Sequence, residues 1–125
     1  DPNQHKWIGV GGKIEKDESI EDALKREVLE ETGFKLTTYT YKGIILFKSD
    51  TYEDEKMHLF TSNEWQGKLK TTDEGELRWI KKDQLDHLSM WQGDTIFLDL
   101  IKSNHPFFTL ELVYEKDVLK KVTFI

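Results

Sequence analysis

Three glutamates, Glu27, Glu30 and Glu31, lie within five residues of one another near the end of a predicted helix. Helical periodicity puts Glu27 and Glu31 in the same stripe as the apolar Ala23 and Val28, so the buried face becomes acidic. Carboxylates this close repel each other by a few tenths of a kcal/mol per pair, and in a last turn they oppose the helix dipole by roughly 0.3–1 kcal/mol each. A divalent cation such as Mg²⁺ or Mn²⁺ would offset that cost, because it prefers clustered carboxylate oxygens.

Taken alone, the three glutamates are more typical of a solvated acidic face with Lys25, Arg26 and Lys35 as counter-charges. The residues around them favour the metal site. Gly12 is followed by five residues and then Glu18, and seven further residues lead to the run Arg26-Glu-Val-Leu-Glu-Glu-Thr-Gly-Phe. So many fixed positions at fixed spacing form a far more specific signal than a lone glycine motif.

This run resembles the Nudix box, Gly-x5-Glu-x7-Arg-Glu-aliphatic-x-Glu-Glu-x-Gly-aliphatic, at every defining position, with Phe34 as the closing apolar residue. Nudix hydrolases as a family cleave nucleoside diphosphates linked to another moiety, using water activated beside Mg²⁺. The resemblance therefore implies an enzyme in which Glu27, Glu30 and Glu31 hold Mg²⁺ or Mn²⁺, with Gly12 close by in the metal site.

Four positions in the pattern have mechanical roles. Gly12 allows a tight turn beside the ligand, and Gly33 ends the helix behind the acidic cluster. Glu18 and Arg26 can form an ion pair that fixes the loop to the helix, which puts Arg26 among the predicted catalytic residues. The alternative for that pair is an ordinary surface ion pair contributing under ~1 kcal/mol.

The reaction also needs a general base, and a carboxylate can fill this role. Glu27 is the predicted base, with Glu30, Glu31 and Glu74 as alternatives. Glu74 lies in an acidic run just before a predicted strand, where Nudix enzymes often hold an additional acidic ligand or base on a loop. Glu76 could serve equally, and a solvated acidic turn is the plainer interpretation of this run.

Residues 7–13 and 89–94, with the aromatic C-terminal segment, are similar to MutT-type oxidised purine nucleoside triphosphatases, the 8-oxo-dGTP diphosphatases. In those enzymes a Trp-x-Asp-Asp segment places a tryptophan on the purine and carboxyls at its edge, which Trp91 and Asp94 match. The predicted substrate-binding residues are Trp91, Asp94, Gly11, Gly12, Lys13 and Ile8.

Two departures put the base preference in doubt. Gly93 stands where those enzymes have the first acid, and Ile8 stands where the animal enzymes have an asparagine that bonds the base. The plainer alternatives are a half-buried core position for Trp91 and a helix N-cap for Asp94.

The resulting hypothesis is Mg²⁺-dependent hydrolysis of a (deoxy)nucleoside triphosphate, with 8-oxo-dGTP as the expected substrate, to monophosphate and pyrophosphate, a function in nucleotide-pool sanitation and DNA repair. Other nucleoside diphosphate derivatives, an RNA 5′ end, or binding without catalysis are the alternatives. A net charge of −6 disfavours long nucleic acid, because backbone recognition needs clustered basic residues.

The sequence predicts one domain over residues 1–125 with an α+β or α/β fold. The predicted elements are a short strand at Trp7–Val10, a helix at Ile20–Thr32 capped by Ser19, strands at Leu36–Lys48, Met57–Trp65 and Leu77–Ile80, a helix at Asp94–Lys102, and a hairpin of Phe107–Tyr114 and Leu119–Phe124. The resemblance implies a Nudix-type α/β/α sandwich with a mixed central sheet, whose N-terminal strand would precede these residues.

The chain has 125 residues, 37% of them hydrophobic, and no cysteine. This composition can fill a core and excludes disulfides, zinc thiolate sites and thiol catalysis. It is typical of a reducing compartment, so we expect a cytoplasmic monomer with a nucleotide as its partner. No apolar run approaches the ~20 residues of a membrane span, and no membrane association is expected.

Overall fold

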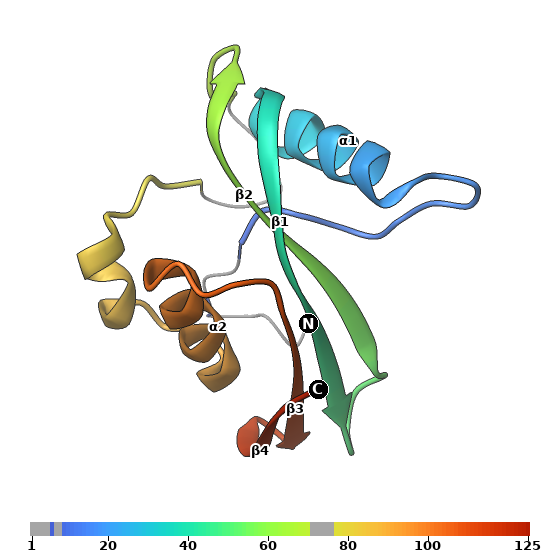
Figure 1. Ribbon diagram of the computed structural model, residues 1–125, viewed down its shortest axis with the longest axis vertical. Helices are drawn as coiled ribbons and strands as arrows, with labels where there is room; N and C mark the ends of the chain where they lie inside the picture. Colours follow the sequence, from blue (N-terminus) through green and yellow to red (C-terminus); the bar gives the residue numbers. More distant parts are fainter. Residues whose placement is uncertain (1–5, 7–8, 71–76) are drawn as a thin grey trace. The chain divides into compact units, whose positions relative to one another are not determined.

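A computed structural model describes residue 6 and residues 9–70 and 77–125 (Figure 1). Its elements, in order, are α1 (Ile20–Thr32), β1 (Lys35–Ser49), β2 (Glu55–Gln66), the 3₁₀ helix η1 (Lys82–His87), α2 (Gln92–Lys102), β3 (Phe108–Glu115) and β4 (Val118–Phe124). None of the helices in these residues is long and apolar enough to cross a membrane.

The strands form a mixed sheet in the order β2-β1-β3-β4. Strand β1 runs parallel to β3, with Gly43 opposite Phe108 and Ser49 opposite Tyr114. Strand β4 returns antiparallel to β3 after a turn at residues 116–117. The mixed sheet and the α+β class that the sequence predicts are therefore confirmed.

The chain divides into two compact units. Unit 1 comprises residues 1–8, 41–61 and 80–125, and unit 2 comprises residues 9–40 and 62–79. The division passes through β1 and β2, so each of these strands contributes a stretch to both units. The predicted glutamate cluster belongs to unit 2, whereas Trp91 and Asp94 belong to unit 1.

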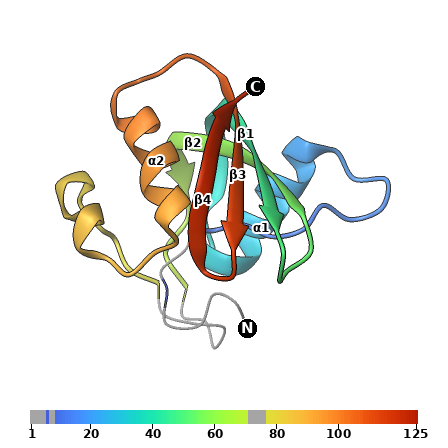
Figure 2. The ribbon, with the colours of Figure 1, turned by 90° about the horizontal axis from the view of Figure 1, so that it is seen from below.

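The core of unit 1 follows from the alternation of β3, in which every second side chain is buried. The buried side chains are Ile45, Phe97, Phe108, Leu110, Leu112 and Tyr114. Helix α2 lies beside β4 (Figure 2) and buries Phe97 in this cluster. Tyr114 belongs to this buried cluster and Trp91 packs against it, so the core holds both residues in place.

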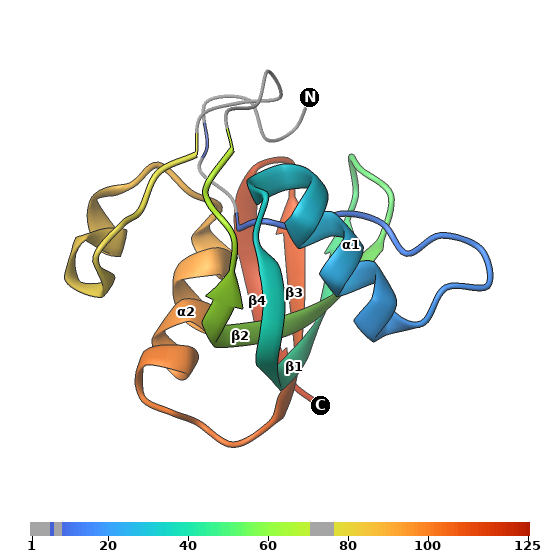
Figure 3. The same ribbon diagram turned by 90° about the horizontal axis from the view of Figure 1, so that it is seen from above.

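Unit 2 contains α1, whose bounds agree with the prediction because both ends carry local signals. The Ser19 Oγ accepts a 3.0 Å hydrogen bond from the Asp22 N–H, which satisfies one of the free donors of the first turn. Gly33 has φ of 83° and donates its N–H to the Leu29 carbonyl, as a left-handed C-cap does. Figure 3 shows the open loop that leads into this helix.

The predicted strand at Leu77–Ile80 is wrong, since these residues adopt no regular structure. Their apolar side chains find contacts without a strand ladder: Trp79, 67% exposed, stacks on Trp65 at 5.5 Å and also meets Phe34. Of the predicted strand at residues 7–10, the first two residues lie outside the described part of the chain and residues 9–10 are not in a strand. The helix η1 is not among the elements predicted from the sequence.

Candidate active site

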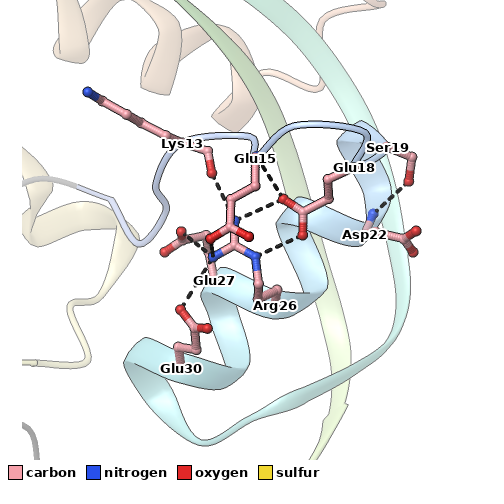
Figure 4. Close-up of polar contacts among 8 residues, drawn as sticks. All are labelled: Lys13, Glu15, Glu18, Ser19, Asp22, Arg26, Glu27 and Glu30. Atoms are coloured by element: carbon pink, nitrogen blue, oxygen red, sulfur yellow. Dashed lines mark hydrogen bonds and ion pairs between the residues drawn. The ribbon is translucent and has the colours of Figure 1, made fainter.

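The Arg26 guanidinium makes an extensive set of polar contacts with described residues of unit 2 (Figure 4). Its Nε and Nη2 donate to the two carboxylate oxygens of Glu18 at 2.8 and 2.9 Å, a bidentate pair. The Glu15 N–H also donates to Glu18, at 3.0 Å. These hydrogen bonds, that of Arg26 first and the backbone N–H second, lower the pKa of Glu18 to about 2. The predicted ion pair between loop and helix is present.

The remaining donors of Arg26 reach the glutamate cluster and the loop. Its Nη1 lies 2.7 Å from Glu27 Oε1 and 3.3 Å from Glu30 Oε2, and its Nη2 donates to the Lys13 carbonyl at 2.9 Å. One planar group therefore orders loop, helix and two carboxylates. We call Lys13, Glu15, Glu18, Arg26, Glu27 and Glu30 the Arg26 cluster.

Glu27 and Glu30 differ in their surroundings although both contact Arg26. The Glu27 side chain is 17% exposed and the Glu30 side chain 60% exposed. A Cβ on Gly12 would lie 2.3–2.5 Å from the Glu27 carboxylate atoms, so glycine leaves the space that this carboxylate occupies. The Gly11 N–H donates to Glu31 Oε2 at 2.9 Å. The glycine turn is thus matched to two of the three glutamates.

The donor set of this cluster fits a hard divalent cation. Glu27 and Glu30 each accept from the same Arg26 nitrogen with one oxygen, so the two carboxylates lie close together on either side of that nitrogen. Across the described ranges, however, no group of three or more acidic or histidine side chains is arranged to hold a metal. Mg²⁺ is usually bound through one or two carboxylates, with waters and substrate phosphates completing its shell, so two neighbouring carboxylates match the number of protein ligands that it needs.

In unit 1, Trp91 is the N-cap residue of α2 and is half-buried against the core. Its ring meets Tyr114 edge-on at 5.3 Å and Tyr52 edge-on at 6.3 Å. The Lys6 ammonium lies 4.5 Å from the ring centroid, a cation–π contact. Trp91 is therefore both a core contact and an aromatic surface that attracts a polar or cationic group.

Asp94 is the third residue of α2 and not its N-cap, so that alternative is wrong: the helix begins at Gln92. Partial burial raises the pKa of Asp94 to about 6. Among the residues that the structure describes, no basic side chain or hydrogen-bond donor is paired with this carboxyl. Within the described residues, this carboxyl is held in place by its helix and by packing alone.

Comparison with known proteins decides the family. The NUDIX domain model matches residues 1–101 of the chain. The chain belongs to the Nudix family.

Nudix relatives with assigned activities are similar over most of the chain. The oxidized purine nucleoside triphosphate hydrolase of Mus musculus is 31% identical over 103 residues, 82% of this chain and 66% of the relative. The protein of the same name from Danio rerio is 35% identical over 98 residues, 77% of this chain and 62% of the relative. The chain thus spans slightly less than two thirds of the length of each.

The same similarity holds at the level of structure. The crystal structure of the MutT protein from Bacillus halodurans superimposes with a TM-score of 0.87 at 29% identity, covering 95% of this chain and 82% of that one. The Nudix fold predicted from the sequence motif is therefore confirmed.

The structure groups most of the predicted Nudix site residues in unit 2, around α1. Those grouped there are Gly11, Gly12, Lys13, Glu18, Arg26, Glu27, Glu30, Glu31 and Gly33. Ile8, Glu74 and Glu76 lie outside the described residues. The catalytic, metal-binding and substrate-binding roles of the set stay predictions.

Sequence reasoning missed three contacts. Glu15 lies 3.7 Å from Arg26 Nη1, and the spacing of the many acidic residues in that loop and helix does not indicate that Glu15 would reach it. Lys6 and Tyr114 both meet Trp91. Long-range contacts of this kind leave no local spacing signal, although the inward phase of β3 does predict a buried Tyr114.

Proposed function

We propose that this Nudix protein is a Mg²⁺-dependent pyrophosphohydrolase of oxidised purine nucleoside triphosphates, with 8-oxo-dGTP as the leading candidate. Water cleaves the anhydride bond between the α- and β-phosphates, and the products are the nucleoside monophosphate, pyrophosphate and a proton. The activity would remove damaged precursors from the cytoplasmic nucleotide pool before they enter DNA. Support comes from family membership and from relatives named as oxidized purine nucleoside triphosphate hydrolases.

The observation that carries the proposal is the placement of Glu27. Its carboxylate is largely buried, held at 2.7 Å by Arg26, and fitted into the space that Gly12 leaves. A general base must be held within hydrogen-bond reach of the attacking water, and a carboxylate fixed from two sides meets that requirement. Glu27 is accordingly assigned as the base, with Glu30 and Glu31 as the alternatives.

The same glutamates would hold the metal. Mg²⁺ bound there would neutralise polyphosphate charge and lower the pKa of a bound water. Glu27 and Glu30 would supply neighbouring carboxylates, and Glu31 is held to the loop by the Gly11 N–H. Arg26 acts as a positioning residue, because its fork sets the direction of the carboxylates rather than reaching the substrate.

Substrate contacts are assigned to two regions. Figure 4 shows the Lys13 side chain extending away from Arg26 while its carbonyl accepts from that residue, which leaves the ammonium for a phosphate. Trp91 offers an aromatic ring to the purine, and the Asp94 carboxyl offers an acceptor, or a donor when protonated, to the base edge.

The test is pyrophosphate release with Mg²⁺ over a panel of oxidised and unmodified nucleoside triphosphates, nucleoside diphosphate derivatives and capped RNA. Glu27→Gln should lower kcat by about 10²–10⁴-fold, because it removes a general base while keeping side-chain size. Glu53→Gln, the same substitution in the exposed β1–β2 loop, should leave kcat unchanged.

The outcomes separate the rival functions. Turnover confined to diphosphate derivatives or capped RNA would change the substrate class. Nucleotide binding with no turnover of any panel member would favour a non-catalytic binding module. Mn²⁺ binding, followed through water proton relaxation, should weaken in Glu30→Gln even where turnover is too slow to measure.

A further inference from the structure

Tyr114 of β3 meets the first turn of α2 at several points. Its hydroxyl oxygen accepts a 2.7 Å hydrogen bond from the Gly93 N–H, and its ring packs edge-on against Trp91 at 5.3 Å. The side chain is 5% exposed, and the nearby Asp94 charge contributes to a raised pKa of the Tyr114 phenol, after burial, which is the main cause. One buried residue therefore contacts Trp91 and Gly93 and lies within electrostatic range of Asp94.

The contact with Tyr114 leaves no room for a side chain at Gly93. A Cβ at residue 93 would lie 2.7 Å from the Tyr114 hydroxyl oxygen and 2.5 Å from Leu112 Cδ1, far inside ordinary contact distance. Leu112 is fully buried and Tyr114 nearly so, which leaves little room for either to move away. The phenol thus occupies space that a side chain at residue 93 would need, so no carboxyl side chain fits there beside Asp94.

We propose that Tyr114 is a positioning residue for nucleobase discrimination: its hydroxyl fixes the backbone at Gly93, and thereby the Trp91 ring and the single Asp94 carboxyl on either side. The inference rests on the proposed function for the identity of the ligand, a purine base whose oxidation changes its donor and acceptor edge. The inference adds Tyr114 of β3 to the residues that hold the base. It also explains why a glycine stands next to the single acid at the start of α2.

The hydroxyl, rather than the ring, carries this role. A phenylalanine ring would fill the core equally well, whereas only the hydroxyl oxygen accepts from the Gly93 N–H. That N–H is among the first donors of α2, which have no partner within the helix. Without the oxygen, the turn loses the bond that sets its position relative to β3.

Tyr114→Phe isolates the hydroxyl. Binding of 8-oxo-dGMP and dGMP would be measured by calorimetry in metal-free buffer, which requires no hydrolysis. The dissociation constant for dGMP divided by that for 8-oxo-dGMP should fall roughly three- to tenfold. This is the effect expected when one buried hydrogen bond that orients the turn is lost. Tyr41→Phe, which removes the hydroxyl that bonds His58, is the matched control and should keep the wild-type ratio.

Tyr114→Phe keeps the buried ring and is expected to fold; Gly93→Ala is the second variant, because it displaces the hydroxyl without removing it, and circular dichroism checks that each variant is folded. A folded variant of either kind with the wild-type ratio would overturn the inference. So would wild-type protein that binds both monophosphates equally. Absence of triphosphate hydrolysis alone would overturn the proposed function and leave this binding test decisive.

Discussion

Folding shifts the pKa values of two carboxyls of this Nudix protein in opposite directions. Glu18 lies within a fork of hydrogen bonds from Arg26 and has a pKa of about 2, whereas Asp94 has no described partner and a pKa of about 6. A partnered acid stays charged and fixed across the physiological range. A partly buried acid without a described partner has a pKa closer to the physiological pH. A ligand that brings a hydrogen-bond donor or acceptor can therefore pair with either of its protonation states.

The difference suggests a division of tasks. In unit 2, the Arg26 cluster fixes carboxylates in place, which suits the constant geometry that metal and phosphate chemistry needs. In unit 1, Asp94 is positioned by packing and backbone contacts, which suits the recognition of a base edge. The comparison predicts that variants in unit 2 change turnover and that variants in unit 1 change discrimination and pH dependence.

Arg26→Lys should have the largest effect of the variants that test this difference between the two units. Lysine keeps the charge but has no planar fork, so it cannot hold Glu18 in two bonds and still reach Glu27 and the Lys13 carbonyl. We expect kcat/KM for the best triphosphate to fall on the order of 10²-fold, since small misplacements of catalytic groups cost about that much.

The control for Arg26→Lys is Arg78→Lys, the same exchange at an exposed arginine of unit 2. Steady-state kinetics on both variants would show whether geometry or charge matters at Arg26. A variant at Arg26 with activity within twofold of wild type would mean that any cation there suffices.

Gly12→Ala is expected to have a smaller effect, confined to activity. The new Cβ would meet the Glu27 carboxylate at 2.3–2.5 Å, and that carboxylate, at the end of a flexible side chain, would move. Neither Gly12 nor its neighbour Gly11 has positive φ, so backbone strain is not involved. We expect kcat to fall roughly tenfold, with the free energy of unfolding changed by less than about 1 kcal/mol.

Gly11→Ala is a matched control, because a Cβ there has nothing within 4 Å and the N–H that donates to Glu31 is kept. Urea unfolding and kinetics of both variants would separate stability from catalysis. Equal losses of activity in the two variants would show that the glycines serve the flexibility of the turn and not the space for Glu27.

Unit 2 was the more predictable part of the site because its signals are local. The cap residues Ser19 and Gly33 fixed both ends of α1, and the spacing of Glu18 from Arg26 anticipated their ion pair. What spacing could not provide is the fan of contacts from one guanidinium to Glu27, Glu30 and the loop, which depends on side-chain rotamers.

Unit 1 was less predictable because its site depends on distant residues. Trp91 caps α2 without a side-chain hydrogen bond, so the sequence carries no capping signal and the predicted start at Asp94 was two residues late. The contact between Gly93 and Tyr114 joins residues 21 apart in the chain and depends on strand phase and helix position together. Local propensity has no access to either.

The smallest expected effect is that of Asp94→Asn on stability. The pKa of Asp94 rises from an ordinary 3.8 to about 6 on folding, so between these pH values the folded protein binds more protons than the unfolded chain. Stability therefore falls as pH rises through this window, and the penalty for a charged, partly buried carboxyl is fully present above about pH 6. Asparagine cannot ionise and avoids it.

We therefore expect Asp94→Asn to be more stable than wild type at pH 8 by about 1–2 kcal/mol after allowance for solvent screening, and to lose that advantage near pH 4. Urea unfolding between pH 4 and 8 measures the difference, with Asp99→Asn on the same helix as control. Glu18 has the opposite sign, since its stabilisation is present at neutral pH and is lost only as pH falls towards about 2. An advantage of Asp94→Asn that is equal at pH 4 and pH 8 would show that folding does not change the pKa of Asp94, and the contrast between the two carboxyls would disappear.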